Sequence, residues 1–261
     1  MLLAIDVGNT EITIGVFEGE KLLQHWRAAT VAERTADEHA LLLGGFLAQE
    51  GLRFAEVVTG VAVSSVVPRL TQALREMVQR YCGFEPFVVE PGIRTGLKIL
   101  TDNPREVGAD RVVNTAAAFA AYGGPAVVVD FGTATTFDAV SERGEYLGGA
   151  IAPGIQISTN ALASHTAQLR RVELAAPRSV VGKNTAEALQ SGIVYGFAGQ
   201  VDGIVRRMVA ELGGRATVIA TGGLAEAVLE ACETVQRHDP WLTLHGLRIV
   251  YDRNAGPPTH G

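Results

Sequence analysis

The chain has 261 residues, of which 47% are hydrophobic and 19% are charged, and its formal net charge is −6. This composition supplies enough apolar material for a normal core and excludes intrinsic disorder, and the length predicts one large domain or two modest ones. Lysine and arginine are scattered, so neither a basic stripe for nucleic acid nor a polybasic helix for a membrane surface is expected.

The first third of the chain predicts an antiparallel meander followed by alternating helices and strands. Three strand-like runs cover residues 2–6, 12–17 and 22–27, with turns at Gly8-Asn9 and at residues 18–20 between them. A capping box from Thr35 to Glu38 then begins a helix. A buried strand is expected over 57–63, a helix with a proline in its first turn over 68–81, and another strand over 86–89.

The rest of the chain continues with a similar alternation. A helix is expected from Asn103 to Gly123, with Gly108 inside it at a cost of about 1 kcal/mol relative to alanine. Strands are expected at 126–130 and 137–140, and a third begins at Tyr146. A long helix over 186–212 starts from an Asn184 cap. A buried strand over 216–220 ends in residues 221–223, TGG, which form either a helix-starting turn or a nucleoside-binding turn.

Two stretches of the chain repeat one design. DVGNTEITIGVFEGE at 6–20 and DFGTATTFDAVSERGE at 130–145 share the same order: Asp, any residue, Gly, a hydroxyl-rich turn, a strand and a Gly-Glu turn. In both copies the aspartate ends a strand. The repeat predicts two similar halves at residues 1–115 and 116–254, followed by a disordered tail over 255–261.

These two turns suit a polyphosphate that is held through a metal. Glycines 8 and 132 allow backbone N–H groups to approach oxygen anions. Asp6 and Asp130 facing each other match a hydrated Mg²⁺, which takes only one or two protein carboxylates besides phosphate oxygens. The alternative, that both aspartates merely cap turns, stays open at this point. The side chains expected to donate to the phosphate oxygens are Asn9, Thr10, Thr13, Thr133, Thr135 and Thr136.

Other motifs are weaker. GKNT at 182–185 ends like a Walker A motif, but the required earlier glycine is replaced by Pro177, so a P-loop is rejected. The six histidines form no zinc motif, and Ser64-Ser65 lacks the frame of a hydrolase nucleophile. Asp110 and Arg111 are either a solvated surface pair or, next to a phosphate site, a proton acceptor and an anion-binding cation.

The sequence also predicts a cytoplasmic protein. Cys82 and Cys232 are far apart and lie in no C-x-x-C motif, so reduced thiols are expected. The N-terminus, MLLAID, lacks the basic region of a signal peptide, and no apolar run reaches 18 residues.

In combination, these motifs resemble the type III pantothenate kinases, within the superfamily of actin, sugar kinases and chaperone ATPases. The resemblance extends from residue 1 to about residue 254. It implies an α/β fold of two similar ribonuclease-H-like (actin-type ATPase) domains, each a mixed sheet flanked by helices, with an ATP cleft between them. The motifs that carry it are DVGNT (6–10), SSVVP (64–68), DNPREVGADR (102–111), DFGTATTFD (130–138), GGAIAPGI (148–155), VGKNT (181–185) and ATGGLA (220–225).

The resemblance further implies ATP-dependent phosphorylation of pantothenate to 4′-phosphopantothenate, the first committed step toward coenzyme A. Asp110 would be the general base, and Asp130 would bind a monovalent cation, potassium or ammonium, which leaves Mg²⁺ on the Asp6 side. Thr185 would reach the substrate from the other subunit of a homodimer, so that the active site straddles the interface. ATP would contact Asp6, Val7, Gly8, Asn9, Thr10, Glu11, Ile12, Thr13 and Thr133, and pantothenate would contact Gly108, Ala109, Asp110, Arg111 and Thr185.

Two alternatives remain at this stage. One is a catalytically weak or inactive ATP-binding homologue with a regulatory or accessory role, which would have no need for the complete set of Asp6, Asp110 and Asp130. The other is a sugar or acetate kinase on the same fold, which the GADR segment at 108–111 and the short chain disfavour. Leu100 and Thr101 stand where some family members carry a tyrosine that contacts pantothenate, so this part of the pocket is expected to differ.

Overall fold

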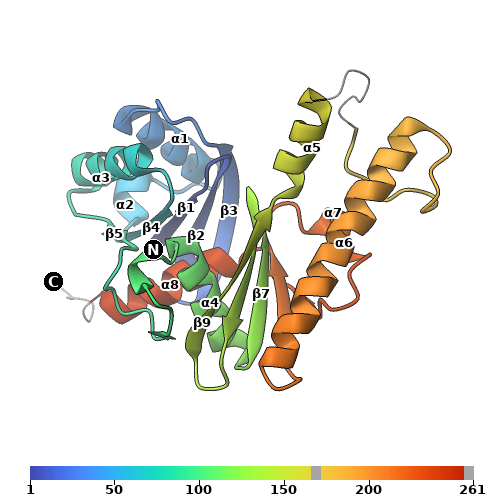
Figure 1. The fold of residues 1–261 in the computed structure, drawn as a ribbon. Coiled ribbons are helices and arrows are strands. Elements are labelled where there is room, and N and C mark those ends of the chain that lie inside the picture. The colour runs from blue at the N-terminus through green and yellow to red at the C-terminus, as the bar shows by residue number, and fades with distance from the viewer. Residues whose placement is uncertain (166–171, 256–261) are drawn as a thin grey trace. The chain divides into compact units, whose positions relative to one another are not determined.

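The computed structural model describes residues 1–165 and 172–255, and its backbone divides into two compact units (Figure 1). Unit 1 comprises Met1–Leu97, Asn103–Ala117 and the C-terminal segment from Thr243. Unit 2 comprises Lys98–Asp102 and Ala118–Leu242. Of the tail that was predicted to be disordered, all but Ala255 lies outside the described residues.

Unit 1 is built on a five-stranded sheet with the order β3-β2-β1-β4-β5. The first three strands form the predicted antiparallel meander, and β4 and β5 continue the sheet in parallel. Its elements are β1 (Leu2–Val7), β2 (Glu11–Glu18), β3 (Lys21–Ala29), α1 (Ala36–Gln49), α2 (Phe54–Val57), β4 (Gly60–Ser65), α3 (Pro68–Cys82), β5 (Phe87–Val88), the 3₁₀ turn η1 (Pro104–Glu106), the first part of α4 (Ala109–Tyr122) and nearly all of α8 (Leu242–Asn254).

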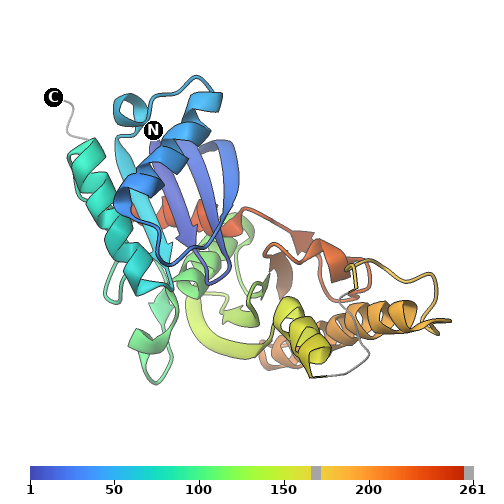
Figure 2. The same cartoon turned by 90° about the horizontal axis from the view of Figure 1, so that it is seen from above.

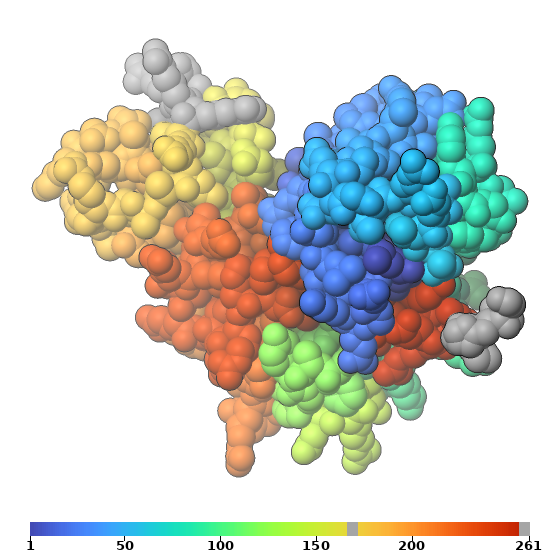
Figure 3. Space-filling view, turned by 180° about the vertical axis from the view of Figure 1, so that it is seen from behind, coloured from blue at the N-terminus to red at the C-terminus, as the bar shows by residue number. Residues whose placement is uncertain are grey.

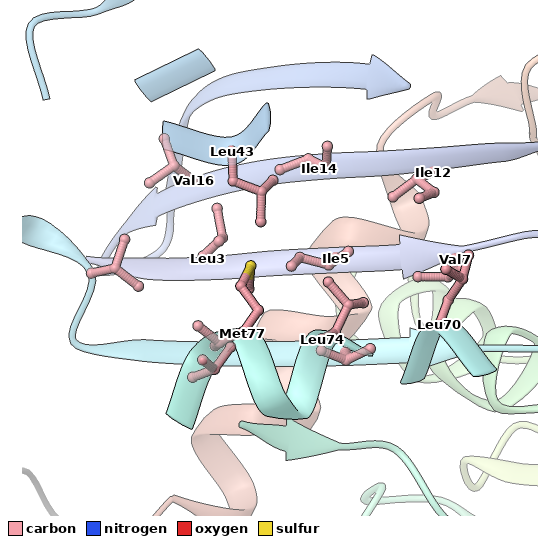
Figure 4. Close-up of a cluster of buried hydrophobic side chains, with 14 of the residues drawn as sticks. Leu3, Ile5, Val7, Ile12, Ile14, Val16, Leu43, Leu70, Leu74 and Met77 are labelled. Atoms are coloured by element: carbon pink, nitrogen blue, oxygen red, sulfur yellow. The ribbon is translucent and has the colours of Figure 1, made fainter. Parts of the chain in front are cut away.

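One face of this sheet forms the main core of unit 1. Alternation along β1 sends Leu3, Ile5 and Val7 to the same side, where they pack with Leu43 of α1 and with α3 (Figure 4). Figure 2 shows α1 lying across the strands of the meander, with α8 behind them. The predicted capping box is confirmed at the start of α1.

The opposite face of the same sheet carries glycines that make room for α8. A Cβ atom on Gly15 would lie 2.7 Å from Leu244, and one on Gly60 would overlap the hydroxyl of Tyr251. The C-terminal helix therefore packs on unit 1, whereas the sequence pattern had assigned residues up to 254 to the second half. Small residues spaced along β2 and β4 were the available signal for this packing.

A contact between α8 and α4 strengthens this assignment. The Thr243 hydroxyl donates a hydrogen bond of 2.7 Å to Asn114 Oδ1, and a Cβ atom on Gly246 would overlap the carbonyl oxygen of Val113. The backbones of α8 and α4 therefore lie in close contact within unit 1.

Unit 2 repeats the topology of unit 1. Its sheet has the order β11-β10-β7-β8-β9-β6, so that β9-β8-β7-β10-β11 corresponds to β3-β2-β1-β4-β5. Even a register shift recurs, between Val16 and Phe17 of β2 and between Ala139 and Val140 of β8. Its elements are β6 (Lys98–Ile99), the end of α4, β7 (Ala126–Phe131), β8 (Ala134–Val140), β9 (Glu145–Pro153), α5 (Ile155–Ser164), α6 (Thr185–Glu211), β10 (Thr217–Thr221), α7 (Glu226–Leu229) and β11 (Arg237–His238).

The core of unit 2 lies on one face of its sheet. Val127, Val129 and Phe131 of β7 pack with apolar side chains of α6, among them Val201 and Val205. The predicted repeat of one strand design is therefore confirmed at the level of topology and of core packing.

Two predicted elements begin later than expected. The strand expected over 57–63 is β4 at Gly60–Ser65, because residues 54–57 form the short helix α2. The helix expected from Asn103 is interrupted: the Asn103 side chain accepts from the Arg105 amide and caps η1, and α4 begins only at Ala109. The prediction placed residues 98–102 in the first half; β6, at Lys98–Ile99, pairs with β9 of unit 2.

Both cysteines are free, as predicted: Cys82 ends α3, and Cys232 follows α7. Within residues 1–165 and 172–255, no helix combines the length and the apolar character needed to cross a membrane.

Candidate active site

Asp6 and Asp130 occupy equivalent positions in the two sheets. Each is the second-last residue of its strand. The strands were predicted to end at the aspartates, one residue before their observed ends at Val7 and Phe131. Both carboxylates lie in register between two hydroxyl side chains, and residues in register point to the same face of a sheet. The two rows are Thr13–Asp6–Ser64 in unit 1 and Thr136–Asp130–Thr221 in unit 2.

The glycine two residues after each aspartate closes a tight hairpin turn. The Gly8 amide donates to the Glu11 carbonyl at 3.0 Å, and the Gly132 amide donates to the Ala134 carbonyl at 3.1 Å. These two N–H groups are therefore engaged within the turns, and a bound phosphate would meet the residues that follow. Thr30 adds a hydrogen bond of 2.8 Å from its hydroxyl to the Gly8 carbonyl, which anchors the first turn to the end of β3.

Burial separates the predicted nucleotide-contacting residues into two groups. The side chains of Val7 and Ile12 are in the core of unit 1, so only their backbone is available to a ligand. Thr135 was predicted as a phosphate donor, but it is completely buried, because alternation along β8 places it on the face opposite Thr136. Asn9, Thr10 and Glu11 are exposed, and Thr13 and Thr133 are half-buried.

Asp130 packs directly against the TGG turn. Gly222 has a φ of +95°, and a Cβ atom there would lie 2.5 Å from Asp130 Oδ1 and 2.6 Å from the Phe131 amide nitrogen. Only glycine fits both the left-handed conformation and this approach. The turn also leads into the short helix α7, since the Ala225 amide donates to the Gly222 carbonyl at 3.2 Å. This fits the helix-starting alternative, and a nucleoside-binding role stays a prediction.

A further segment of unit 2 closes on the second hairpin. Gly154 precedes α5, and a Cβ atom on it would overlap the Thr133 carbonyl and lie 2.6 Å from the Gly132 carbonyl. Three motifs that are distant in sequence, at 130–133, 148–155 and 220–225, therefore meet around Asp130.

Asp110 lies in the first turn of α4, which Gly108 directly precedes. The Gly108 carbonyl accepts from the Val112 amide at 3.2 Å, and Asp110 Oδ1 accepts from the Arg111 amide at 2.9 Å. A Cβ atom on Gly108 would lie 2.5 Å from this carboxylate oxygen. The glycine therefore precedes the helix and leaves space for the Asp110 side chain, which approaches its backbone closely. Ala109, Asp110 and Arg111 are all half-buried, which disfavours a fully solvated surface pair.

Thr185 is exposed at the first position of α6. Two hydrogen bonds in the N-terminal cap of this helix fix the backbone around it. Asn184 Oδ1 accepts from the Glu187 amide at 2.9 Å, and Glu187 Oε2 accepts from the Lys183 amide at 2.9 Å. The bond from Lys183, with the ion pair to Arg178, lowers the pKa of Glu187 from its ordinary value. The GKNT motif therefore forms the N-terminal cap of α6.

The predicted site residues are divided between the two units. Unit 1 contains residues 6–13 together with Gly108, Ala109, Asp110 and Arg111, and unit 2 contains Asp130, Thr133 and Thr185. Among the residues that the structure describes, no group of three or more histidine, cysteine, aspartate or glutamate side chains is arranged to hold a metal ion.

Sequence patterns missed a buried polar group beside Asp130. Asp138 of β8 is completely buried, and its two oxygens accept from the Tyr146 hydroxyl at 2.8 Å and from the Thr136 hydroxyl at 3.2 Å. A carboxylate among the apolar residues Phe137, Ala139 and Val140 was the available signal.

Comparison with known proteins points to a single family. Residues 2–207 match the family model described as type III pantothenate kinase. A curated relative of that name from Streptomyces griseus subsp. griseus is 59% identical over 262 residues, which cover 98% of this chain and 99% of the relative. Another of that name, from Acidothermus cellulolyticus, is 60% identical over 256 residues, with 98% and 99% covered.

Solved structures support the predicted fold. A protein from Campylobacter jejuni described as a Baf family transcriptional activator has a TM-score of 0.61 at 19% identity, covering 97% of this chain and 98% of that one. The ROK hexokinase from Thermus thermophilus has a TM-score of 0.52 at 16% identity, covering 95% and 97%. At these identities the likeness concerns the fold alone, and the predicted α/β fold of two similar actin-type ATPase domains is confirmed.

Proposed function

This chain belongs to the type III pantothenate kinase family, and we propose that it phosphorylates pantothenate with ATP, using Asp110 as the general base. The product is 4′-phosphopantothenate, formed in the first committed step toward coenzyme A. The single observation that carries the activity is identity of 59–60% to kinases of this name over nearly the whole chain. The curated relatives give no support to the alternative of an inactive homologue, and the solved structure described as a transcriptional activator is too distant in sequence to favour it.

In this proposal the first hairpin binds ATP together with Mg²⁺. Asn9 and Thr10 have exposed side chains and lie within the turn that the Gly8 amide closes. Asp6 lies in register between Thr13 and Ser64. One carboxylate beside hydroxyl groups fits Mg²⁺, which is held mainly by phosphate oxygens and water. When bound, the metal neutralises charge on the transferring phosphoryl group. Thr133 of the second hairpin, in unit 2, would also contact the nucleotide.

Asp110 and Arg111 would act on pantothenate. The hydrogen bond from the Arg111 amide fixes one oxygen of the Asp110 carboxylate and leaves the other to accept the proton of the attacking hydroxyl. Arg111 suits the carboxylate of pantothenate, and the N-terminus of α4 adds a partial positive charge. Gly108 and Ala109 would line the same wall, because Gly108 directly precedes this helix and Ala109 begins it.

We further propose that Asp130 binds a monovalent cation, potassium or ammonium. The observation that fits is its position between the hydroxyl side chains of Thr136 and Thr221, with Gly222 leaving space for the carboxylate. Oxygen donors of this kind suit a hard cation.

A homodimer is also part of the proposal, with Thr185 contacting the substrate of the partner subunit. The start of α6 lies near α5 at one end of unit 2 (Figures 1 and 3), and several large apolar side chains are exposed there. Exposed apolar side chains of this size, where they gather, are typical of an interaction surface. These residues are Ile157, Leu162, Val180, Val181 and Tyr195. The proposed enzyme works in the cytoplasm, which suits its two free cysteines.

A coupled assay with purified protein, pantothenate, Mg-ATP and potassium chloride tests the proposal. We expect Asp110→Asn to reduce turnover by roughly 10²–10⁴-fold, the usual contribution of a general base, with an unchanged melting temperature. Asp37→Asn, at an exposed position of α1, is the matched control and should retain the wild-type rate. A wild-type protein without phosphopantothenate formation would refute the activity, and a near-normal rate in Asp110→Asn would exclude this residue as the base.

A further inference from the structure

The buried carboxylate of Asp138 has no assigned role in the proposed reaction. It is completely buried, and it is held by the hydroxyl groups of Tyr146 and Thr136. Burying a charge is unfavourable unless hydrogen bonds compensate for the lost water. This raises the question of whether the fold itself requires the carboxylate.

The repeat answers this question, because unit 1 contains the same position without a charge. Thr13 faces Asp6 as Thr136 faces Asp130, and two residues further along the strands stand Gly15 and Asp138. Gly15 makes room for Leu244. The position of Tyr146, opposite Val140 just after the register shift, corresponds to Leu22, which pairs with Phe17. The architecture therefore accommodates apolar or small residues at both places, and the tyrosine–aspartate pair is an addition in unit 2.

The geometry connects this pair to Asp130 through Thr136. Thr136 and Asp138 are two residues apart on one strand, so they share a face of the sheet, and Thr136 is in register with Asp130. A threonine hydroxyl has one proton and two lone pairs. Because that proton is directed to Asp138 Oδ2, the Thr136 oxygen is left as an acceptor for other groups. Asp138 itself lies diagonally from Asp130 on the neighbouring strand, with a Cα–Cα distance of about 7–8 Å.

We propose that Asp138, held by Tyr146, is a positioning residue that takes the Thr136 hydroxyl proton and so makes the Thr136 oxygen an electron-pair donor for the monovalent cation at Asp130. This inference rests on the proposed cation role of Asp130. It explains why one device serves both cations: potassium is coordinated by oxygen lone pairs, and ammonium donates its protons to them.

Two variants test the polarity of this arrangement. In Asp138→Asn the new amide keeps the shape, but it can donate to the Thr136 oxygen, which turns the threonine proton toward the cation. Thr136→Val removes the oxygen altogether. For both variants we expect the potassium concentration for half-maximal activity to rise by about 10–100-fold, the usual effect of losing a ligand-orienting partner, with kcat largely recovered at saturating potassium.

Controls separate this role from general stability. Thr136→Ser retains the hydroxyl and should restore the wild-type potassium dependence. Tyr122→Phe removes another tyrosine–aspartate hydrogen bond of unit 2, to Asp239, and should leave the potassium dependence unchanged. As a readout independent of turnover, the melting temperature is measured with a non-hydrolysable ATP analogue while potassium chloride replaces choline chloride at constant ionic strength. The potassium-induced rise should need more salt in Asp138→Asn and Thr136→Val.

The outcomes distinguish this inference from the proposed function. A wild-type enzyme that is equally active in choline chloride would refute both the cation role of Asp130 and this inference. If the wild type depends on potassium but both variants keep its half-activation concentration, only the inference fails, and Asp138 is purely structural. A raised half-activation concentration in both variants, with rescue by Thr136→Ser, supports it.

Discussion

The two units share a strand order, a register shift and an aspartate at the same place, yet they fill the aspartate-bearing face of the sheet differently. In unit 1 Gly15 and Gly60 allow Leu244 and Tyr251 of α8 to pack closely. In unit 2 the position equivalent to Gly15 is a buried carboxylate with hydroxyl partners. The repeated topology therefore gives the two aspartates equivalent positions, whereas the side chains around them give each a different environment.

The largest effect on stability is expected at the turn beside Asp130. Gly222→Ala forces a side chain into a left-handed conformation and against Asp130 and the Phe131 backbone, so we expect unfolding to become easier by roughly 2–5 kcal/mol. Urea unfolding measures this. Gly132→Ala is the control, because its Cβ atom would meet nothing closer than 3.5 Å. Equal stability of the two variants would contradict the close packing at this turn.

Buried titratable groups give a second contrast, since Asp138 has hydroxyl partners but His39 of α1 is buried with no partner for Nε2 in the described part of the chain. Burial lowers the pKa of His39 to about 4 from 6.5. The unfolded chain therefore binds a proton that the folded protein resists, and stability present above pH 6.5 is lost as the pH falls toward 4. We expect a loss of roughly 1–3 kcal/mol over that range.

Urea unfolding at pH 7 and pH 5 tests this, with His39→Leu as the comparison. The variant should lose less stability than the wild type between the two pH values, because it lacks the titrating group. A pH dependence identical to that of the wild type would show that His39 is not responsible.

Two helix glycines should respond in opposite directions to the same substitution. In Gly246→Ala the new Cβ atom overlaps the Val113 carbonyl, so we expect a net destabilisation of roughly 1–2 kcal/mol despite the better helix propensity of alanine. Gly45 of α1 has nothing within 4 Å, so Gly45→Ala should stabilise by roughly 0.5–1 kcal/mol. Thermal unfolding measures both. Stabilisation by Gly246→Ala would contradict the close contact between Gly246 of α8 and the Val113 carbonyl of α4.

The last comparison concerns two helix caps, whose loss should affect stability equally and activity differently. Thr35 caps α1 of unit 1, and Asn184 caps α6 of unit 2. Replacing either with alanine should cost about 1 kcal/mol of stability. Only Asn184→Ala should also weaken kinase activity, because it loosens the start of α6, where Thr185 stands. Equal activity of the two variants would argue against a role of Thr185 at the site.

Much of the local structure followed from the sequence by itself. Alternating and helical periodicity predicted the meander, the long helix α6 and the core strands, and residue chemistry predicted the caps at Thr35 and Asn184. The repeat identified Asp6 and Asp130 as equivalent, which the register now supports through their hydroxyl neighbours. These features depend on residues close in sequence, so local patterns are sufficient to specify them.

Other features were decided only by the tertiary structure. The return of α8 to unit 1, the pairing of β6 with β9 and the approach of Gly222 to Asp130 all join segments distant in the chain. Strand register likewise decided that Thr135 is buried while Thr136 lies beside Asp130. Periodicity indicates that a residue is buried, but it does not say against which partner, because that choice depends on how whole elements fit together.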